Sequence, residues 1–243
     1  MRIEGSGPPL VLVPGMDGTG ELFYRQVPLL AASYRVGRYR LRDDAETMDV
    51  LVDDLAGVVR ALSPGGEPAV VVGESFGGAV ALSFALARPE LVSALVVLNS
   101  FPRFLPQLWL RLAIVTLAAV PFTWQAMTVV RRLTAFRLHS RYTHRREIRR
   151  FLELTAATTR RAYLARLKIL RRYDVRDRLA EIRAPTLFIA SEHDHLVPAV
   201  TQARYMAERI AGAQVRVLEG HGHICVIAPN VDLDAILREW RAG

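Results

Sequence analysis

A serine between two closely spaced glycines is the first residue whose setting indicates chemistry. Residues 73–77 read Gly-Glu-Ser-Phe-Gly, a G-x-S-x-G motif that joins an apolar run to a helical pattern. At such a strand-to-helix turn the hydroxyl is held above the edge of a sheet, next to a helix N-terminus that favours an oxyanion. The motif therefore predicts Ser75 as a nucleophile. The alternative is that Ser75 is only a helix N-cap.

A serine hydroxyl needs a base that removes its proton. Of six histidines, His221 and His223 directly follow the apolar run Val215–Leu218, which places them at the same sheet edge as Ser75. The apolar residues 224–229 would pack His223 against the core. We therefore predict His223 as the base and leave His221 as a residue that shapes the loop.

The base in turn needs a carboxylate that orients it. Glu192 and Asp194 both follow the apolar run Thr186–Ala190, and Asp194 directly precedes the Leu-Val-Pro anchor of residues 196–198. We predict Asp194 for this role. The alternative is an aspartate that only forms a turn or caps a helix.

A glycine-rich loop follows the first apolar run, Leu10–Val13. Residues 14–20 read Pro-Gly-Met-Asp-Gly-Thr-Gly, and such a loop can point N–H groups at a substrate oxygen. We predict the N–H groups of Met16 and Phe76 as the oxyanion donors. A phosphate cradle is disfavoured because the loop lacks both the G-K-[ST] ending and the G-x-G-x-x-G spacing.

The elements that position these residues alternate between strands and helices. Five strand candidates are mostly apolar and do not alternate, as expected for a parallel sheet that is covered on both faces. They are Leu10–Val13, Ala69–Val72, Ala94–Leu98, Thr186–Ala190 and Val215–Leu218, and a weaker candidate is Arg35–Tyr39. The helix candidates between them are Val50–Leu62, Phe76–Ala87, Thr201–Ile210 and Val231–Trp240. The alternation predicts an open α/β sheet with right-handed crossovers.

The alternation breaks between residues 101 and 183, where only helical spacing is found. This segment holds 19 basic and 5 acidic residues, a net charge of +14, although the whole chain carries only +8. We predict residues 1–100 and 184–243 as the core and residues 101–183 as an inserted helical cap. Such a charge attracts anions, a membrane surface or nucleic acid.

The composition is that of a globular protein. The chain has 243 residues, 51% of them hydrophobic and 23% charged, which excludes a disordered or collagen-like chain. The single cysteine excludes an intramolecular disulfide framework and a multi-cysteine metal site, and we predict neither metal nor cofactor. The polar segment Met1–Pro9 has no signal-peptide character, so we expect a cytoplasmic protein.

One uncharged stretch, Leu112–Val130, approaches the length of a membrane span. It contains 19 residues, but Pro121 lies at its centre and arginines bracket it. Two short soluble helices are therefore favoured over an interfacial helix or a membrane span.

The four motifs, 14–20, 73–78, 192–198 and 222–223, resemble those of α/β-hydrolase-fold serine hydrolases, in the family's order. The resemblance implies an α/β fold whose mostly parallel sheet carries helices on both faces and a helical cap between the family's sixth and seventh strands. There are two departures. Pro14-Gly15 replaces the His-Gly that often precedes the oxyanion residue, and the usual first hairpin is barely represented before Leu10. The second departure predicts about six strands.

The resemblance also limits the activity. Serine at the nucleophile position argues against haloalkane dehalogenases and epoxide hydrolases of this fold, which carry aspartate there. The leading hypothesis is a carboxylic-ester hydrolase acting on a small-molecule ester with a lipophilic acyl or alcohol part. An acyltransferase or a thioesterase using the same triad is the alternative, and a catalytically silent binding protein is a further one.

The cap has both an apolar and a basic character. Trp109, Trp124 and Met127 are the predicted residues of the substrate pocket. The basic residues are either a solvated face or a surface for an acidic carrier protein or anionic lipid. In its placement the cap resembles that of esterases acting on acyl groups held by acyl carrier protein. Nucleic-acid binding is not expected, because no recognised module is present. The sequence leaves the oligomeric state open.

Overall fold

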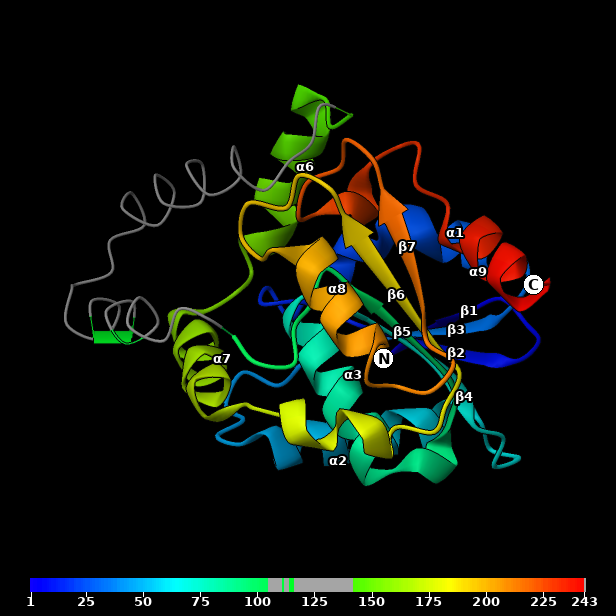
Figure 1. The fold of residues 1–243 in the computed structure, drawn as a ribbon. Helices are drawn as coiled ribbons and strands as arrows, with labels where there is room; N and C mark the ends of the chain where they lie inside the picture. The colour runs from blue at the N-terminus through cyan, green and yellow to red at the C-terminus, as the bar shows by residue number, and fades with distance from the viewer. Residues whose placement is uncertain (105–110, 112–113, 116–141, 243) are drawn as a thin grey trace.

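The computed structural model describes residues 1–104, 111, 114–115 and 142–242. Their centre is one seven-stranded sheet with the strand order β1-β3-β2-β4-β5-β6-β7 (Figure 1). Neighbouring strands are parallel except for β1 and β3, which are antiparallel. The strands are β1 (Arg2–Glu4), β2 (Pro9–Val13), β3 (Arg35–Arg38), β4 (Ala69–Glu74), β5 (Val92–Leu98), β6 (Thr186–Ser191) and β7 (Gln214–Leu218). The predicted α/β fold is confirmed.

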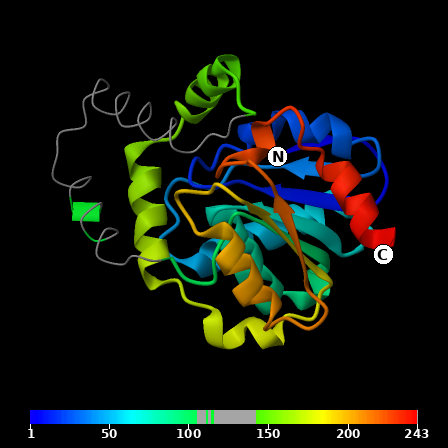
Figure 2. The same ribbon diagram turned by 45° about the horizontal axis from the view of Figure 1, so that its top comes forward.

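Helices cover both faces of the sheet because the central strands are apolar on both sides. In β2, Val11 and Val13 pack with the helices of one face, whereas Leu10 and Leu12 pack with those of the other. This alternation follows from the two-residue period of a strand. Figures 1 and 2 show the two layers. The first face carries α2 (Met48–Leu62), α3 (Phe76–Ala87) and α8 (Ala199–Ala207), and the second carries α1 (Gln26–Leu30) and α9 (Leu233–Ala242).

The prediction of about six strands was wrong, because β1 adds a seventh. All three residues of β1 are exposed, so the strand has no apolar pattern that could reveal it. It is held by backbone pairing, with Ile3 opposite Gly37. The edge strand β7 also differs from the expectation of a buried strand, since its residues are exposed or half-buried.

The helix predicted over Phe76–Ala87 is found with the same bounds, whereas α2, α8 and α9 begin two residues from their predicted starts and α8 and α9 end two or three residues from their predicted ends. The second helix begins at Met48, because Thr47 is its N-cap and accepts a hydrogen bond from the Val50 N–H at 3.4 Å. The helix α8 begins at Ala199, directly after Pro198. The described residues also contain short 3₁₀ turns: η1 (Glu21–Arg25), η2 (Pro89–Leu91), η3 (Arg176–Glu181) and η4 (Cys225–Ile227).

The insertion leaves the sheet after β5 and returns at β6. Its described part contains α6 (Arg145–Thr155), α7 (Arg160–Arg172) and the turn η3. Both helices lie at the end of the sheet where the strands have their carboxyl ends (Figure 1). The division into a core and a cap stays a prediction. The predicted pocket residues Trp109, Trp124 and Met127 lie outside the described residues, as does all but Ile114 and Val115 of Leu112–Val130. Among the helices that the structure describes, none has the length and apolar character for a membrane span.

Candidate functional site

Ser75 lies on the sharp turn between β4 and α3. Its backbone has φ 55° and ψ −117°, a conformation that non-glycine residues seldom adopt. The turn is anchored by the Ser75 N–H, which donates to Leu98 O of β5 at 2.8 Å. Such strain persists only where the surrounding structure enforces it, and it is common at functional sites.

The glycines of the motif make this turn sterically possible. A Cβ at Gly77 would overlap the carbonyl oxygens of Val13 and Pro14, and one at Gly73 would overlap the Gly77 carbonyl. The turn therefore packs directly against the start of the glycine-rich loop, and any larger side chain would push the two apart.

The structure brings Ser75, His223 and Asp194 together in one hydrogen-bonded chain. His223 Nε2 lies 2.8 Å from Ser75 Oγ, and His223 Nδ1 lies 2.7 Å from Asp194 Oδ2. The side chains of His223 and Asp194 are almost completely buried. With Nδ1–H donated to the carboxylate, Nε2 is the acceptor for the serine hydroxyl, which is the arrangement that a serine nucleophile needs.

The two carboxylates that follow β6 have different partners. Asp194 Oδ1 accepts hydrogen bonds from the N–H groups of Leu196 and Val197, both at 2.9 Å, so the second oxygen is held toward the histidine. Glu192 Oε2 instead accepts from the Gly220 N–H at 2.8 Å and connects the two loops. Glu192 therefore supports the loop that carries His223 without a hydrogen bond to the His223 ring.

His221 is directed away from the serine. Its Nδ1 lies 2.9 Å from Glu219 O and its Nε2 lies 3.1 Å from Asn230 Oδ1, while the Tyr142 ring packs against it at a centroid distance of 4.8 Å. Both ring nitrogens are thus engaged within the loop, and His221 shapes the loop that carries His223.

Glu74, directly before the serine, is a buried acid that the sequence interpretation did not single out. Burial raises its pKa to about 7, opposed by the charge of His223 and assisted by Asp17 and Asp194. For His223, burial lowers the pKa, but the hydrogen bond and charge of Asp194, together with Glu74, outweigh this and raise it. The charge states of Glu74 and His223 are therefore coupled, and each affects the pKa of the other.

Two consecutive residues after β5 form hydrogen bonds to the serine turn, the histidine loop and the end of β6, and sequence reasoning missed both. Asn99, at φ 46°, donates through Nδ2 to His223 O at 2.6 Å and to Ser191 Oγ at 2.9 Å, and its Oδ1 accepts from the Ser191 N–H at 2.7 Å. Ser100 Oγ donates to Ser75 O at 2.7 Å. The only available signal was their place directly after an apolar strand.

The glycine-rich loop lies beside Ser75, as predicted from its place after β2. Gly18 N–H donates to Gly15 O at 3.0 Å, so Met16 and Asp17 occupy the two central positions of a turn. Phe76 is the first residue of α3, where a backbone N–H has no partner within the helix. The assignment of the Met16 and Phe76 N–H groups as oxyanion donors stays a prediction.

Neither a metal nor a reactive thiol is indicated within the part of the chain that the structure describes. No three His, Cys, Asp or Glu side chains there are grouped so that they could hold a metal ion. Cys225 is buried, and burial raises the pKa of its thiol to about 12, so it stays protonated at neutral pH.

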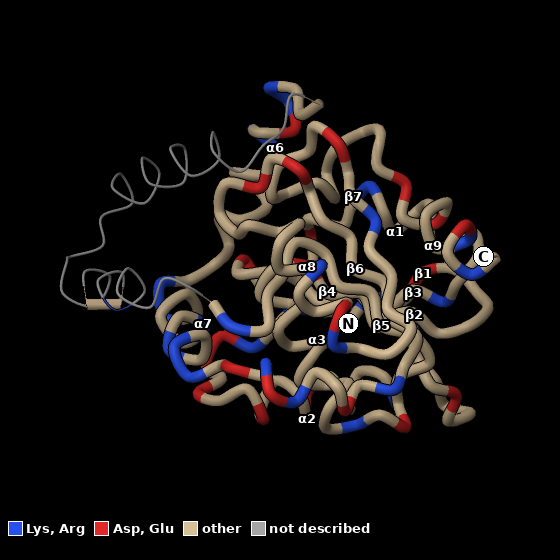
Figure 3. The backbone as a smooth tube through the Cα atoms, in the orientation of Figure 1, with Lys and Arg blue, Asp and Glu red and all other residues tan. Residues whose placement is uncertain are grey.

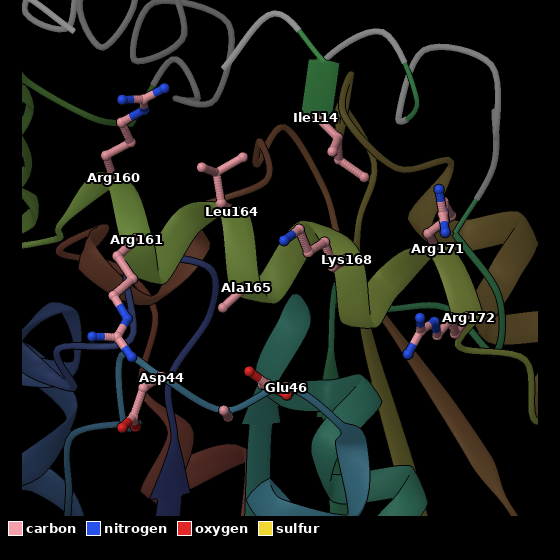
Figure 4. A pocket seen from close by; sticks show the side chains of 11 residues that line it. Asp44, Glu46, Ile114, Arg160, Arg161, Leu164, Ala165, Lys168, Arg171 and Arg172 are labelled. Carbon is pink, nitrogen blue, oxygen red and sulfur yellow. The ribbon is translucent and has the colours of Figure 1, made fainter. Parts of the chain in front are cut away.

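A basic groove lies along α7, away from the serine. It has a volume of about 720 Å³, and Figure 4 shows basic side chains of α7 along one side, with Asp44 and Glu46 opposite. Figure 3 shows the same concentration of Lys and Arg on α7. The basic residues of the groove are Arg160, Arg161, Lys168, Arg171 and Arg172.

Comparison with known proteins agrees with this geometry. Residues 8–227 match the model of the alpha/beta hydrolase fold family. The pimeloyl-[acyl-carrier protein] methyl ester esterase of Methylococcus capsulatus is 32% identical over 82% of this chain and 81% of its own length. A relative from Azorhizobium caulinodans that carries the name carbamate hydrolase RutD is 28% identical over 97% of this chain and 92% of its own.

Solved structures share the fold. A hydrolase from Pseudomonas aeruginosa PA01 superimposes with a TM-score of 0.88 at 23% identity, covering 100% of this chain and 93% of that one. The enol-lactonase of Burkholderia xenovorans LB400 superimposes with a TM-score of 0.86 at 21% identity, covering 100% of this chain and 95% of that one. The family model matches most of the length of the chain, and the strand order of the sheet agrees with it. The chain therefore belongs to the alpha/beta hydrolase fold family.

Proposed function

We propose that this protein is a serine hydrolase that cleaves carboxylic esters through an acyl-enzyme. The observation that carries the proposal is the buried hydrogen-bond chain from Ser75 Oγ through His223 to Asp194, at 2.8 and 2.7 Å. The residue types and the order of the hydrogen bonds are those of a nucleophile, its base and the carboxylate that orients the base.

In the first half of the reaction, Ser75 Oγ bonds to the ester carbonyl carbon while its proton passes to His223 Nε2. Asp194 stabilises the resulting imidazolium without accepting its proton. The negative oxygen receives hydrogen bonds from the N–H groups of Met16 and Phe76. The carbon–oxygen bond to the alcohol then breaks, and the leaving oxygen takes the proton from His223.

In the second half, water replaces the alcohol. His223 removes a proton from the water as it attacks the acyl carbon, and the same proton returns to Ser75 Oγ when the acid leaves. An acceptor alcohol in place of water would give acyl transfer by the same steps, and a thioester in place of the ester would give a thioesterase. Product analysis with and without an added alcohol distinguishes transfer from hydrolysis.

The groove on α7 supports an acidic partner for the substrate. Arg161, Lys168, Arg171 and Arg172 are exposed along it, and no ion pair within the described residues engages them. A row of free cations attracts an anionic surface, and the attraction weakens with salt. The relative from Methylococcus capsulatus is named for an ester on an acyl-carrier protein. We propose an ester whose apolar acyl chain is presented by an acidic carrier protein.

The first experiment tests the nucleophile and the bond that is cleaved. A fluorophosphonate probe should label the wild-type protein but not Ser75→Ala, and p-nitrophenyl esters should be hydrolysed faster as the acyl chain lengthens from acetate. Each buried CH₂ contributes about 0.8 kcal/mol to such a preference. A wild-type protein that resists the probe, or that cleaves aryl carbamates faster than matched esters, contradicts the proposal.

The second experiment tests the carrier. Replacing Arg161, Arg171 and Arg172 together with glutamine should raise KM for an ester on an acidic carrier protein, most strongly at low salt, and leave small neutral esters unaffected. The matched control replaces three exposed arginines outside the insertion, Arg204, Arg209 and Arg216. If both triple variants lose the same activity on the carrier-bound ester, or if the groove variant also loses activity on neutral esters, the arginines of the groove do not bind the carrier. They are then an ordinary solvated face.

A further inference from the structure

One buried arginine connects the insertion to the glycine-rich loop. Arg166 lies on the inner side of α7 and is 1% exposed, and it is the largest fully buried side chain among the described residues. The reaction steps above do not use it. A buried guanidinium is costly, and an apolar side chain of similar volume would fill the same space without that cost. Its place therefore requires an explanation from its contacts.

The guanidinium of Arg166 is directed at the turn that carries Met16. Nη1 donates to Met16 O at 2.9 Å and to Asp17 O at 3.1 Å, so one group holds both central carbonyls of the turn. Nη2 donates to Leu41 O at 3.4 Å and pairs with Asp43 Oδ1 at 3.3 Å. Charge-assisted hydrogen bonds of this kind are stronger and more directional than neutral ones.

The turn is shaped to receive this side chain. Gly18 has φ 68°, and a Cβ at that position would overlap the guanidinium of Arg166. Thr158, two residues before α7, adds a further donor from the insertion, because its Oγ1 donates to Asp17 O at 2.8 Å. The insertion thus fixes the conformation of the turn through two side chains at its carbonyl oxygens.

We propose that Arg166 is a positioning residue of the oxyanion hole, which holds the Met16 N–H in place through the carbonyls of the turn. The inference rests on the proposed function, in which Met16 supplies one donor. Arg166 contacts the carbonyls of the turn and does not contact the substrate. The donors of an oxyanion hole act because they are held before the charge develops, so loosening the turn lowers kcat more than it raises KM.

The experiment compares Arg166→Gln with the wild type on a neutral p-nitrophenyl ester. We expect kcat to fall about 10- to 100-fold with KM changed less than about 3-fold, since a misplaced donor costs somewhat less than a deleted one. The affinity for a trifluoromethyl ketone, which forms an oxyanion on Ser75, should fall in parallel with kcat/KM. Arg166→Lys, which keeps the charge, should recover part of both losses.

Two further variants keep the test decisive. Asp43→Asn removes the carboxylate partner of Arg166 near the surface and should lower kcat and ketone affinity together, about 2- to 5-fold. Arg40→Gln removes the exposed arginine that also pairs with Asp43, at 2.9 Å, and should leave both unchanged. If Arg166→Gln only lowers the melting temperature, with ketone affinity and kcat retained, the inference is overturned. If Arg166→Gln does not fold, unchanged ketone affinity in Asp43→Asn overturns it.

These outcomes are separate from a failure of the proposed function. A wild-type protein that the fluorophosphonate probe does not label, and that cleaves no ester, contradicts the function itself. A labelled and active wild type together with an unaffected Arg166→Gln contradicts only the role of Arg166.

Discussion

Replacing Asn99 tests whether one side chain holds the loops of the site together. Its amide joins β5 to the histidine loop and to the end of β6 through hydrogen bonds of 2.6, 2.7 and 2.9 Å, and Nδ2 also lies 3.5 Å from Cys225 Sγ. The partners are His223 O, the Ser191 hydroxyl and the Ser191 N–H, all within the interior. Asn99→Ala deletes the amide and leaves a buried carbonyl and a buried N–H without a partner.

The magnitude follows from these contacts and from the backbone. A buried polar group that loses its partner costs about 1–3 kcal/mol, and alanine at a positive φ costs about 1 kcal/mol more than asparagine or glycine. We therefore expect the two groups and the backbone together to lower the free energy of unfolding of Asn99→Ala by about 3–7 kcal/mol. In a chain of 243 residues this corresponds to a fall in melting temperature of roughly 10–20 °C. Asn99→Gly keeps the backbone conformation and should be about 1 kcal/mol less destabilising.

Urea denaturation followed by circular dichroism measures the stability, and ester hydrolysis at 15 °C measures the site in the folded protein. Both variants should show a lower kcat even where they are fully folded, because the His223 loop is no longer fixed to β5. Gln202→Ala on α8 serves as the control variant. Asn230→Asp is unsuitable for this purpose because the Asn230 side chain contacts His221. If Asn99→Ala loses less than about 1 kcal/mol, or keeps kcat when folded, the reasoning is refuted.

Four other predictions concern the same site. His223→Ala should lower kcat by several orders of magnitude and His221→Ala by less than about tenfold, because only His223 contacts Ser75. Steady-state kinetics measure both losses. A larger loss in His221→Ala than in His223→Ala would show that the assignment is wrong. Activity should fall on acidification as His223 becomes protonated, with a midpoint above about 6.5 because its pKa is raised. Glu74→Gln removes a charge that raises this pKa, so the acid limb of the pH–rate profile should move to lower pH; an unchanged or upward shift contradicts the coupling. Gly77→Ala should reduce soluble yield and abolish probe labelling, because its Cβ overlaps the Val13 carbonyl; a fully active variant would show that the turn can relax.

The central sheet and the meeting of Ser75, Asp194 and His223 at its edge could be predicted because each follows a local pattern. Ser75, Asp194 and His223 each follow an apolar run, and the carboxyl ends of parallel strands meet at one edge. Their residue types then restrict the chemistry. The same reasoning separated His223 from His221, since only His223 is followed by an apolar segment that packs onto the core.

Other parts of the site depend on contacts between distant segments, which no local pattern reveals. Asn99 lies 124 residues before His223, and Arg166 lies 150 residues after Met16. In the sequence, Arg166 is one of many arginines in a basic segment, and only the packing of α7 shows that it is buried. Glu74 directly precedes Ser75, but its raised pKa depends on burial and on neighbours from three loops. The strand β1 was missed because hydrogen-bonded pairing at an exposed edge needs no apolar residue.

The hydrogen bond between Ser75 and His223 joins residues that are 148 positions apart. Closing so long a loop costs entropy before its contacts can form, and folds that depend on distant pairings form slowly for this reason. The nearby helices α2 and α3, in contrast, need only local hydrogen bonds. During refolding from urea, helical circular dichroism should therefore recover before labelling by the fluorophosphonate probe. The recovery of probe labelling at Ser75 then reports when β4 and the histidine loop have docked. Its rate therefore measures how fast the sheet is completed.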